Sequence, residues 1–382
     1  MTRAPRTLTL WVAATSVAVF GLASVACYRP GGVTYRDLAV VSLRNALVAL
    51  DDKSLDSKSR LTAYSEGLRR TDLLLRRALE SNPTDTASIE RMATVRWEAG
   101  VLAGTTDADS VASLMNIAAT RAPRVPEIHA GLGDLFYRMG LPERASPFMK
   151  RAVELSPSMA IRAVATMQAA GVLPGEILDV LPPVPEVLIA VRDQFIASGQ
   201  GLSYLDHVEH QLARATPMLL TIYGEACREL RVPERLRDRI VALPSTRDPG
   251  VRAARLCQTA HAWLSLGDPQ RALVLADEAR RATPTDPGVI EFYGEVALAG
   301  GLGAEAETAF RRSLELVLAL AEGAEPTRRA RLYDALGRSL EAQGRADFAY
   351  DAFRRAVEID PSFRNAAARV AAYEHLSSSP PP

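Results

Sequence analysis

The sequence predicts an all-α protein, built as an α-solenoid of helix–turn–helix repeats and closed by a C-terminal capping helix. Two observations lead to this fold class. First, segments of about 10 to 16 residues space their apolar positions three and four apart and are separated by Gly or Pro, while strand-like alternation is missing. Second, one order of residues recurs along the chain, which is typical of stacked repeats rather than of two or three separate cores.

The clearest copy of the recurring pattern is "EIHAGLGDLFYRMGLPERASPFMKRAVELSP", which ends at Pro157. Its Leu132 and Gly133 are expected on a first helix that Gly140 ends, and its Ala145 on a second helix that Pro157 closes. The same order returns in "RLYDALGRSLEAQGRADFAYDAFRRAVEIDP", which ends at Pro361. This pattern resembles the tetratricopeptide repeat, a helix–turn–helix unit of 34 residues.

Two further copies lie between these segments. The third shares Trp263, Gly267, Ala272, Ala279 and Pro284 with the pattern, and the fourth shares Tyr293, Gly294, Gly301, Ala306 and Phe310. The resemblance therefore implies one repeat at residues 126–157 and three consecutive repeats at 253–363. The amphipathic stretch at 364–377 is expected to cap the last repeat, and 378–382 to be a disordered tail.

Two regions depart from the pattern. Residues 35–125 have hairpin-length helical segments without most signature residues, so we expect degenerate repeats there, with helices near 35–51, 60–81, 86–99 and 107–121. In residues 158–252, prolines at 174, 182, 183 and 185 demand short helices and sharp turns, and the superhelix is expected to bend or break register. This proline-rich segment resembles helical-repeat segments found with bacterial O-antigen ligases and polysaccharide-export loci, which implies a role in surface polysaccharide assembly or export.

The N-terminus has the order of an export signal. Arg3 and Arg6 precede an uncharged run from Leu8 to Ala26 that ends in small residues. The stretch "GLASVAC" resembles a bacterial lipobox, which implies cleavage after residue 26 and lipidation of Cys27, with Tyr28 offering no inner-membrane retention signal. The expected location is the periplasmic face of the outer membrane, with 27–34 as a tether. A plain signal peptide and an uncleaved membrane anchor are the alternatives, which would leave a soluble periplasmic or an inner-membrane protein.

Composition argues against nucleic acid as a partner. Basic and acidic residues number 45 each, and no basic run interleaves with aromatic residues. Besides Cys27, the chain has only Cys227 and Cys257, and an oxidising periplasm permits a disulfide between them; two buried free thiols are the equal alternative.

Possible catalytic and metal-binding residues are few. In "HVEH", His207 and His210 share a helical face beside Glu209, but no third ligand is near, and a surface pair is the expected reading. Cys257 and His261 lie four apart, as a nucleophile pair could, yet no residue to orient the imidazole is evident. Catalytic motifs are otherwise missing, so we expect neither an enzyme nor a cofactor, metal or small-molecule substrate. A metal- or Cys/His-dependent envelope enzyme, or an accessory subunit of one, is the alternative.

The remaining candidate site is a surface. Stacked helix pairs expose an inner wall made by the first helix of each unit, where partner peptides or helices of other proteins bind. Carry-over from the repeat resemblance places a set of mainly acidic residues there: Glu127, Asp134, Tyr137, His261, Glu291, Glu295, Arg331, Asp334, Arg338 and Glu341. This set departs from the Lys and Asn clamp of chaperone-binding relatives, so a basic or mixed-charge segment of another envelope protein is the expected partner.

Overall fold

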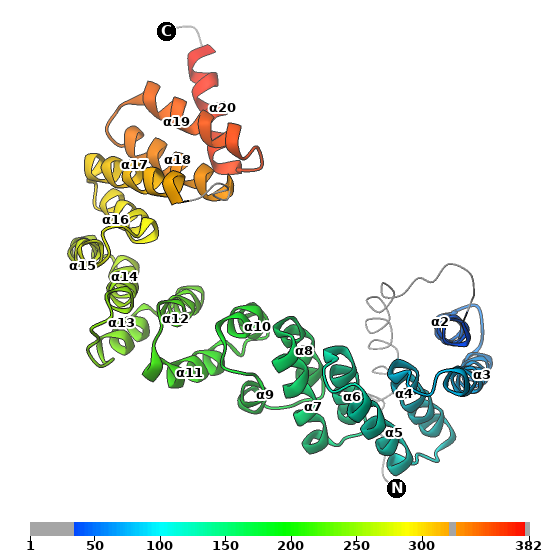
Figure 1. The fold of residues 1–382 in the computed structure, drawn as a ribbon. Helices are drawn as coiled ribbons and strands as arrows, with labels where there is room; N and C mark the ends of the chain where they lie inside the picture. Colours follow the sequence, from blue (N-terminus) through cyan, green and yellow to red (C-terminus); the bar gives the residue numbers. More distant parts are fainter. Residues whose placement is uncertain (1–33, 321–325, 379–382) are drawn as a thin grey trace. The chain divides into compact units, whose positions relative to one another are not determined.

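A computed structural model describes residues 34–320 and 326–378 of the chain. In these two ranges every regular element is a helix and no residue lies in a strand, which confirms the predicted all-α solenoid class. The chain, whose helices are labelled in Figure 1, divides into two compact units between Pro182 and Pro183, inside the proline-rich segment. We call residues 34–182 unit 1 and residues 183–378 unit 2.

Unit 1 is built from helices that pack in sequential pairs, α2 with α3, α4 with α5 and α6 with α7. Its helices are α2 (Tyr35–Asp51), α3 (Ser57–Ser81), α4 (Thr86–Ala103), α5 (Ala108–Arg121), α6 (Pro126–Arg138), α7 (Pro142–Leu155), the 3₁₀ turn η1 (Pro157–Met159), α8 (Ala160–Ala169) and α9 (Pro174–Val180). The short α9 begins at a proline and ends before two more, as the proline spacing predicts.

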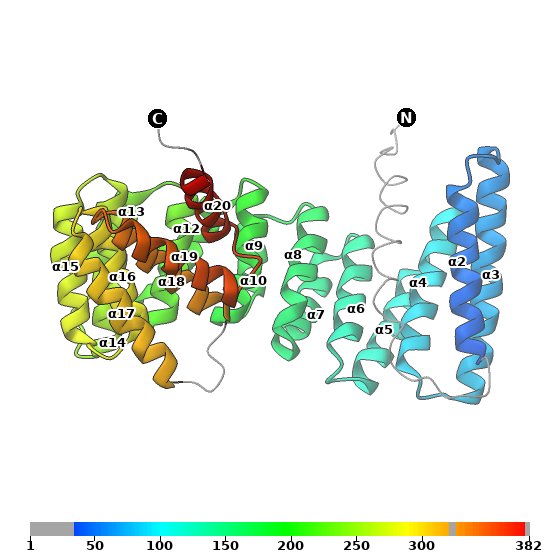
Figure 2. The same cartoon turned by 90° about the horizontal axis from the view of Figure 1, so that it is seen from above.

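Unit 2 repeats the pairing, with α14 on α15, α16 on α17 and α18 on α19 (Figure 2). Its helices are α10 (Pro185–Ala197), α11 (Gly201–Gln211), η2 (Leu212–Arg214), α12 (Pro217–Glu229), α13 (Pro233–Val241), α14 (Pro249–Ser265), α15 (Pro269–Ala282), α16 (Pro287–Ala299), α17 (Gly303–Leu320), α18 (Pro326–Glu341), α19 (Ala346–Ile359) and α20 (Arg364–Ser378). Helix α20 packs on α19, where the capping helix was expected.

Short polar signals set the helix starts in unit 2. Helices α14, α15 and α16 each begin with an aspartate cap followed by proline at the first helical position. The Asp248 carboxylate accepts from Val251 N–H at 2.9 Å, and the Asp268 carboxylate accepts from Arg271 N–H at 3.0 Å. The aspartate accepts a hydrogen bond from a backbone N–H of the first helical turn, and proline has no backbone N–H that would need a partner. Each of these Asp-Pro pairs therefore favours the start of a helix.

The signature residues of the repeats serve close packing. Ala145, Ala272, Ala306 and Ala349, at the same place in the four copies, are fully buried. Phe353 of the last repeat and Phe310 of the repeat before it belong to one core cluster with Leu332 and Leu340. Small residues bring the helix backbones together and the aromatic rings fill the space that remains.

The predicted leader, Cys27 and the tether up to residue 33 lie outside the described residues. The described chain starts at Thr34, whose side chain caps α2 in a reciprocal capping box with Asp37. Among the helices of residues 34–320 and 326–378, none combines the length and the apolar character that a membrane crossing requires.

Candidate functional site

The first helices of successive pairs in unit 2 lie next to one another. Helix α12 contacts α14, α14 contacts α16, and α16 contacts α18, although a second helix separates each of these pairs in the sequence. We call α12, α14, α16, α18 and the cap α20 the first-helix wall. It contains all the predicted interaction residues after residue 250.

Ion pairs between neighbouring helices cross the first-helix wall. Glu291 on α16 pairs with Arg331 on α18, with 2.9 Å between Oε1 and Nε, and Arg328 lies 3.6 Å from its other oxygen. Glu295 on α16 pairs with Arg338 on α18 at 3.4 Å. The sequence alone suggested a mainly acidic wall. In the structure, however, these carboxylates are paired with arginines and are not free negative charges.

The same arrangement joins the last repeat to the cap. Glu341 on α18 pairs with Arg369 on α20 and accepts a hydrogen bond from the Tyr373 hydroxyl at 3.1 Å. Arg369 also lies over the ring of Phe353, 5.1 Å from its centroid. The cap thus continues the charge pattern of the wall instead of ending it.

Asp334 is the most enclosed acid of the wall. Its residue is 5% exposed, and burial raises the pKa of its carboxyl group. Oδ2 accepts from Arg338 Nε at 3.1 Å, whereas Oδ1 has no hydrogen-bond partner among the described residues. Asp334 therefore fixes the orientation of Arg338 from beneath the surface.

His261 and Cys257 lie four residues apart on α14, in surroundings that do not favour a nucleophile pair. The His261 ring packs against Phe292 of α16, with 4.2 Å between ring centroids. Burial, and then the positive charge of Arg228, lower the pKa of His261 to about 3, while burial raises the pKa of the Cys257 thiol to about 12. A protonated thiol beside a weakly basic imidazole does not favour thiolate chemistry.

The predicted residues of unit 1 occupy three different environments. Glu127 is exposed at the start of α6. Asp134 is half-buried, its pKa is raised by burial, and it accepts from Thr166 of α8 at 3.4 Å. Tyr137 is 7% exposed and its hydroxyl lies 3.0 Å from the Ser146 hydroxyl on α7, so its side chain lies within the α6–α7 pair.

The two histidines of "HVEH" contact neighbours on their own helix. His207 Nε2 lies 2.7 Å from Gln211 Nε2, and His210 Nδ1 lies 2.6 Å from the Asp206 carbonyl oxygen. Glu209 instead accepts from Arg235 at 2.6 Å. In residues 34–320 and 326–378, no three side chains of the metal-ligating types are grouped as a metal ion would need. Cys227 and Cys257 are both buried free thiols, the second of the two predicted alternatives.

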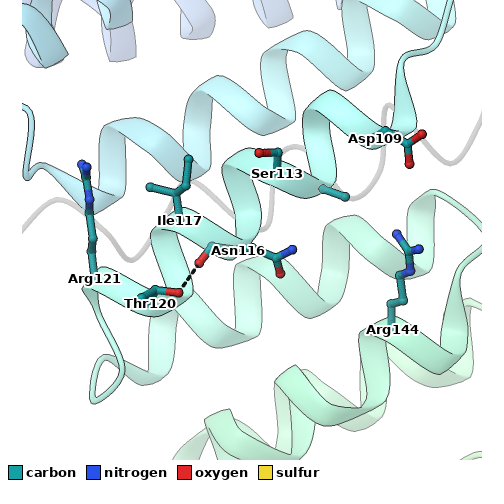
Figure 3. Close-up of a pocket in the computed structure, with 8 residues that line it drawn as sticks. Asp109, Ser113, Asn116, Ile117, Thr120, Arg121 and Arg144 are labelled. Atoms are coloured by element: carbon teal, nitrogen blue, oxygen red, sulfur yellow. Dashed lines mark hydrogen bonds between the residues drawn. The ribbon is translucent and has the colours of Figure 1, made fainter.

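Sequence reasoning missed one depression in unit 1, between the second helices α5 and α7 (Figure 3). It has a volume of about 550 Å³, and polar side chains line most of it: Asp109, Ser113, Asn116, Thr120, Arg121 and Arg144. Thr120 and Arg121 already donate to the backbone oxygens of Asn116 and Pro83. The side chains follow no catalytic pattern, because each is ordinary for an exposed helix face.

Sequence reasoning also missed Arg228 and Gln258 on the first-helix wall. Arg228 Nη1 donates to Gln258 Oε1 at 3.0 Å, which links α12 to α14. Helix α12 lacks most signature residues of the repeat, so no carry-over reached it. The available sequence signal was Gly224, because Tyr223-Gly224-Glu225 repeats the order of Tyr293-Gly294-Glu295. In the structure, a Cβ at residue 224 would overlap the Gln258 amide.

The tetratricopeptide repeat family model matches residues 126–159 and 330–363, which cover α6–α7 and most of α18–α19. The chain therefore contains tetratricopeptide repeats in these two segments. Its geometry agrees, since both matched segments are helix pairs with a buried alanine at the crossing of the second helix.

Three solved structures illustrate the similarity found by structure comparison. MamA is 16% identical, with 47% of this chain and 94% of that chain covered and a TM-score of 0.33. TTC0263, a thermophilic protein of the same repeat class from Thermus thermophilus, is 18% identical, with 65% and 98% covered and a TM-score of 0.32. PilW, a type IV pilus biogenesis factor, is 11% identical, with 88% and 98% covered and a TM-score of 0.26. No curated protein matches the chain in sequence.

Proposed function

We propose that this protein is a non-catalytic scaffold of the bacterial cell envelope, and that the first-helix wall of unit 2 binds a segment of a partner protein. The observation that supports this most directly is the continuity of the wall. Charged side chains on α16, α18 and α20 join each of these helices to the next across the wall. The enclosed thiol and imidazole of α14 do not favour the enzyme alternative.

The envelope part of this proposal comes from the leader. A basic start, an apolar run and "SVAC" before Tyr28 support export and lipidation at Cys27. Bacterial lipoproteins carry several acyl chains, and a single chain gives only marginal membrane binding. The proline-rich segment supports the narrower proposal of a role in surface polysaccharide assembly or export.

Site-specific photocrosslinking tests the binding surface. A photoreactive amino acid replaces Glu295, which is exposed on α16 of the wall, or Val274, which is 69% exposed on the second helix α15. The proposal expects an adduct with one envelope protein from Glu295 in living cells, lost when Arg331→Glu is added, and none from Val274. Equal adducts from both positions, or none from either, would contradict it.

Mass measurement tests the anchor separately. The proposal expects purified wild-type protein to lack residues 1–26, to carry acyl mass and to partition into detergent. Cys27→Ser should lose both the acyl mass and the partitioning. A variant that partitions unchanged would show that the lipid anchor is wrong, without touching the crosslinking result.

A further inference from the structure

The arginines of the first-helix wall differ in how their positive charge is balanced. Arg331, Arg338 and Arg369 each pair with a carboxylate on a neighbouring helix. Arg228 on α12 has no carboxylate of the described residues within 4.0 Å, and its hydrogen bond goes to the neutral amide of Gln258. Among the described residues, Arg255, Arg329 and Arg364 of the wall likewise have no carboxylate in contact, but Arg255 donates to backbone oxygens instead. Arg228 differs from these three because a side chain of the neighbouring first helix holds it.

The acids nearest to Arg228 in sequence belong to another partner. Glu225 and Glu229, on the same helix, both pair with Arg192 of α10. Their negative charges raise the pKa of Arg228 without contacting it. Burial lowers that pKa by more, so the pKa of Arg228 is lowered overall. A half-buried guanidinium without a carboxylate in contact is costly, and an external anion would relieve that cost.

The position of Arg228 is set by close packing. Gln258 is 5% exposed and accepts from Arg228 Nη1, and its amide occupies the space above Gly224 of α12. Because a side chain at residue 224 would expel the amide, the glycine holds Gln258 and Gln258 holds Arg228. The guanidinium is thus pre-oriented, and its remaining N–H groups can donate to a ligand.

An aromatic surface lies beside this guanidinium on the next two helices. Gln258, which holds Arg228, lies three residues before His261 on α14, and the His261 ring packs on Phe292 of α16. Both rings are half-buried. The imidazole is neutral at physiological pH, so it adds an apolar face and a hydrogen-bonding edge but no charge.

We propose that Arg228 binds an acidic side chain of the partner segment, and that an apolar or aromatic neighbour of that side chain packs on His261 and Phe292. This inference rests on the proposed function and adds the chemistry of the ligand. It changes the expectation of a basic or mixed-charge partner, because the wall acids are already paired while Arg228 is not. Guanidinium and carboxylate form two parallel hydrogen bonds, which fits an Asp or Glu side chain.

Peptide titration followed by NMR tests the proposal on the full-length mature protein with ¹³C-labelled histidines. The probes are acetyl-Gly-Glu-Phe-Glu-Gly-amide, the same peptide with Gln for Glu, and acetyl-Gly-Gln-Phe-Gln-Gly with a free carboxylate. The acidic peptide should shift the His261 signal saturably and bind at least ~10-fold more tightly than the Gln peptide, as a charged hydrogen bond would give. Equal binding of the first two, or tighter binding of the free-carboxylate peptide, would overturn the acidic side chain as ligand.

Variants locate the binding on Arg228. Arg228→Gln should weaken the acidic peptide at least ~10-fold, while Arg331→Gln, which removes an already paired arginine, should change it less than about twofold. Arg228→Lys keeps the charge and serves if the Gln variant is poorly folded by circular dichroism. If Arg228→Gln and Arg331→Gln are equivalent, the inference fails; if the Glu295 crosslink also persists in Arg228→Gln, the scaffold proposal stands without it.

Discussion

Phe353 occupies the space that a side chain at residue 337 would need. A Cβ on Gly337 of α18 would lie 2.5 Å from Cε1 of Phe353 on α19, and Phe353 is fully buried. The glycine and the aromatic ring of the repeat therefore pack as one unit, because the missing side chain at residue 337 leaves the space that the Phe353 ring fills.

The first prediction concerns this pair. Gly337→Ala should lower the free energy of unfolding by about 1–3 kcal/mol, because overpacking outweighs the gain in helix propensity of about 1 kcal/mol. Gly175 on α9 is the matched control, since a Cβ there meets no atom within 4 Å. Gly175→Ala should be neutral or stabilising in the same urea titration. Two variants with the same sign would show that the close approach of Phe353 has no energetic weight.

The second prediction concerns a buried ion pair in unit 1. The Tyr64 hydroxyl of α3 donates to Glu98 of α4 at 2.5 Å, and Glu98 pairs with Arg138 of α6 at 2.7 Å. Because Glu98 is 7% exposed, Arg138→Met leaves a buried carboxylate without its counter-charge and should cost about 3–5 kcal/mol. Tyr64→Phe should cost about 1–3 kcal/mol.

An exposed pair supplies the control for that experiment. Arg151 and Glu154 lie 3.4 Å apart on α7 with side chains 46% and 39% exposed. Arg151→Ala should change the free energy of unfolding by less than about 1 kcal/mol. Thermal and urea unfolding of the three variants measures these changes in the free energy of unfolding. If Arg138→Met loses no more stability than Arg151→Ala, the buried pair has no structural role.

The third prediction concerns the pH dependence of stability. Burial lowers the pKa of His261 to about 3, well below its unfolded value near 6.5. Between these two values the unfolded chain binds the proton and the folded chain does not, so His261 makes stability fall as pH falls from 6.5 towards 3. His261→Gln should flatten the stability profile in that window and leave its slope unchanged above about pH 7. A parallel profile for both proteins would show that the ring titrates normally.

The fourth prediction concerns the two thiols. Burial raises the pKa of both Cys227 and Cys257 to about 12, and the structure holds them as free thiols. In a Cys27→Ser background, iodoacetamide at about pH 8 should label neither within the time that labels both in guanidinium chloride. Intact mass gives the count of labels. A loss of two mass units without labelling in denaturant would instead reveal a disulfide.

Some features of the site could be predicted from the sequence and others could not. The repeat pattern placed Glu291, Glu295, Arg331 and Arg338 on first helices, and the structure has them there. It did not indicate that they pair with each other, because a pattern read along one helix says nothing of which side chain the next helix brings opposite. Tyr137 was expected on the wall, yet the structure places it within the α6–α7 pair, where Ser146 offers its hydroxyl a partner.

The sequence by itself determined the all-α solenoid and the helix pairs of the matched repeats. Those signals are local: apolar spacing, Asp-Pro starts, turn glycines and the Gly–aromatic packing pair all act within one repeat. Only the tertiary structure decided which charges of the first-helix wall are paired, which arginines are left without a carboxylate in contact, and how deeply His261 and Cys257 are enclosed. These depend on side chains from separate repeats, which come into contact only when the helix pairs stack.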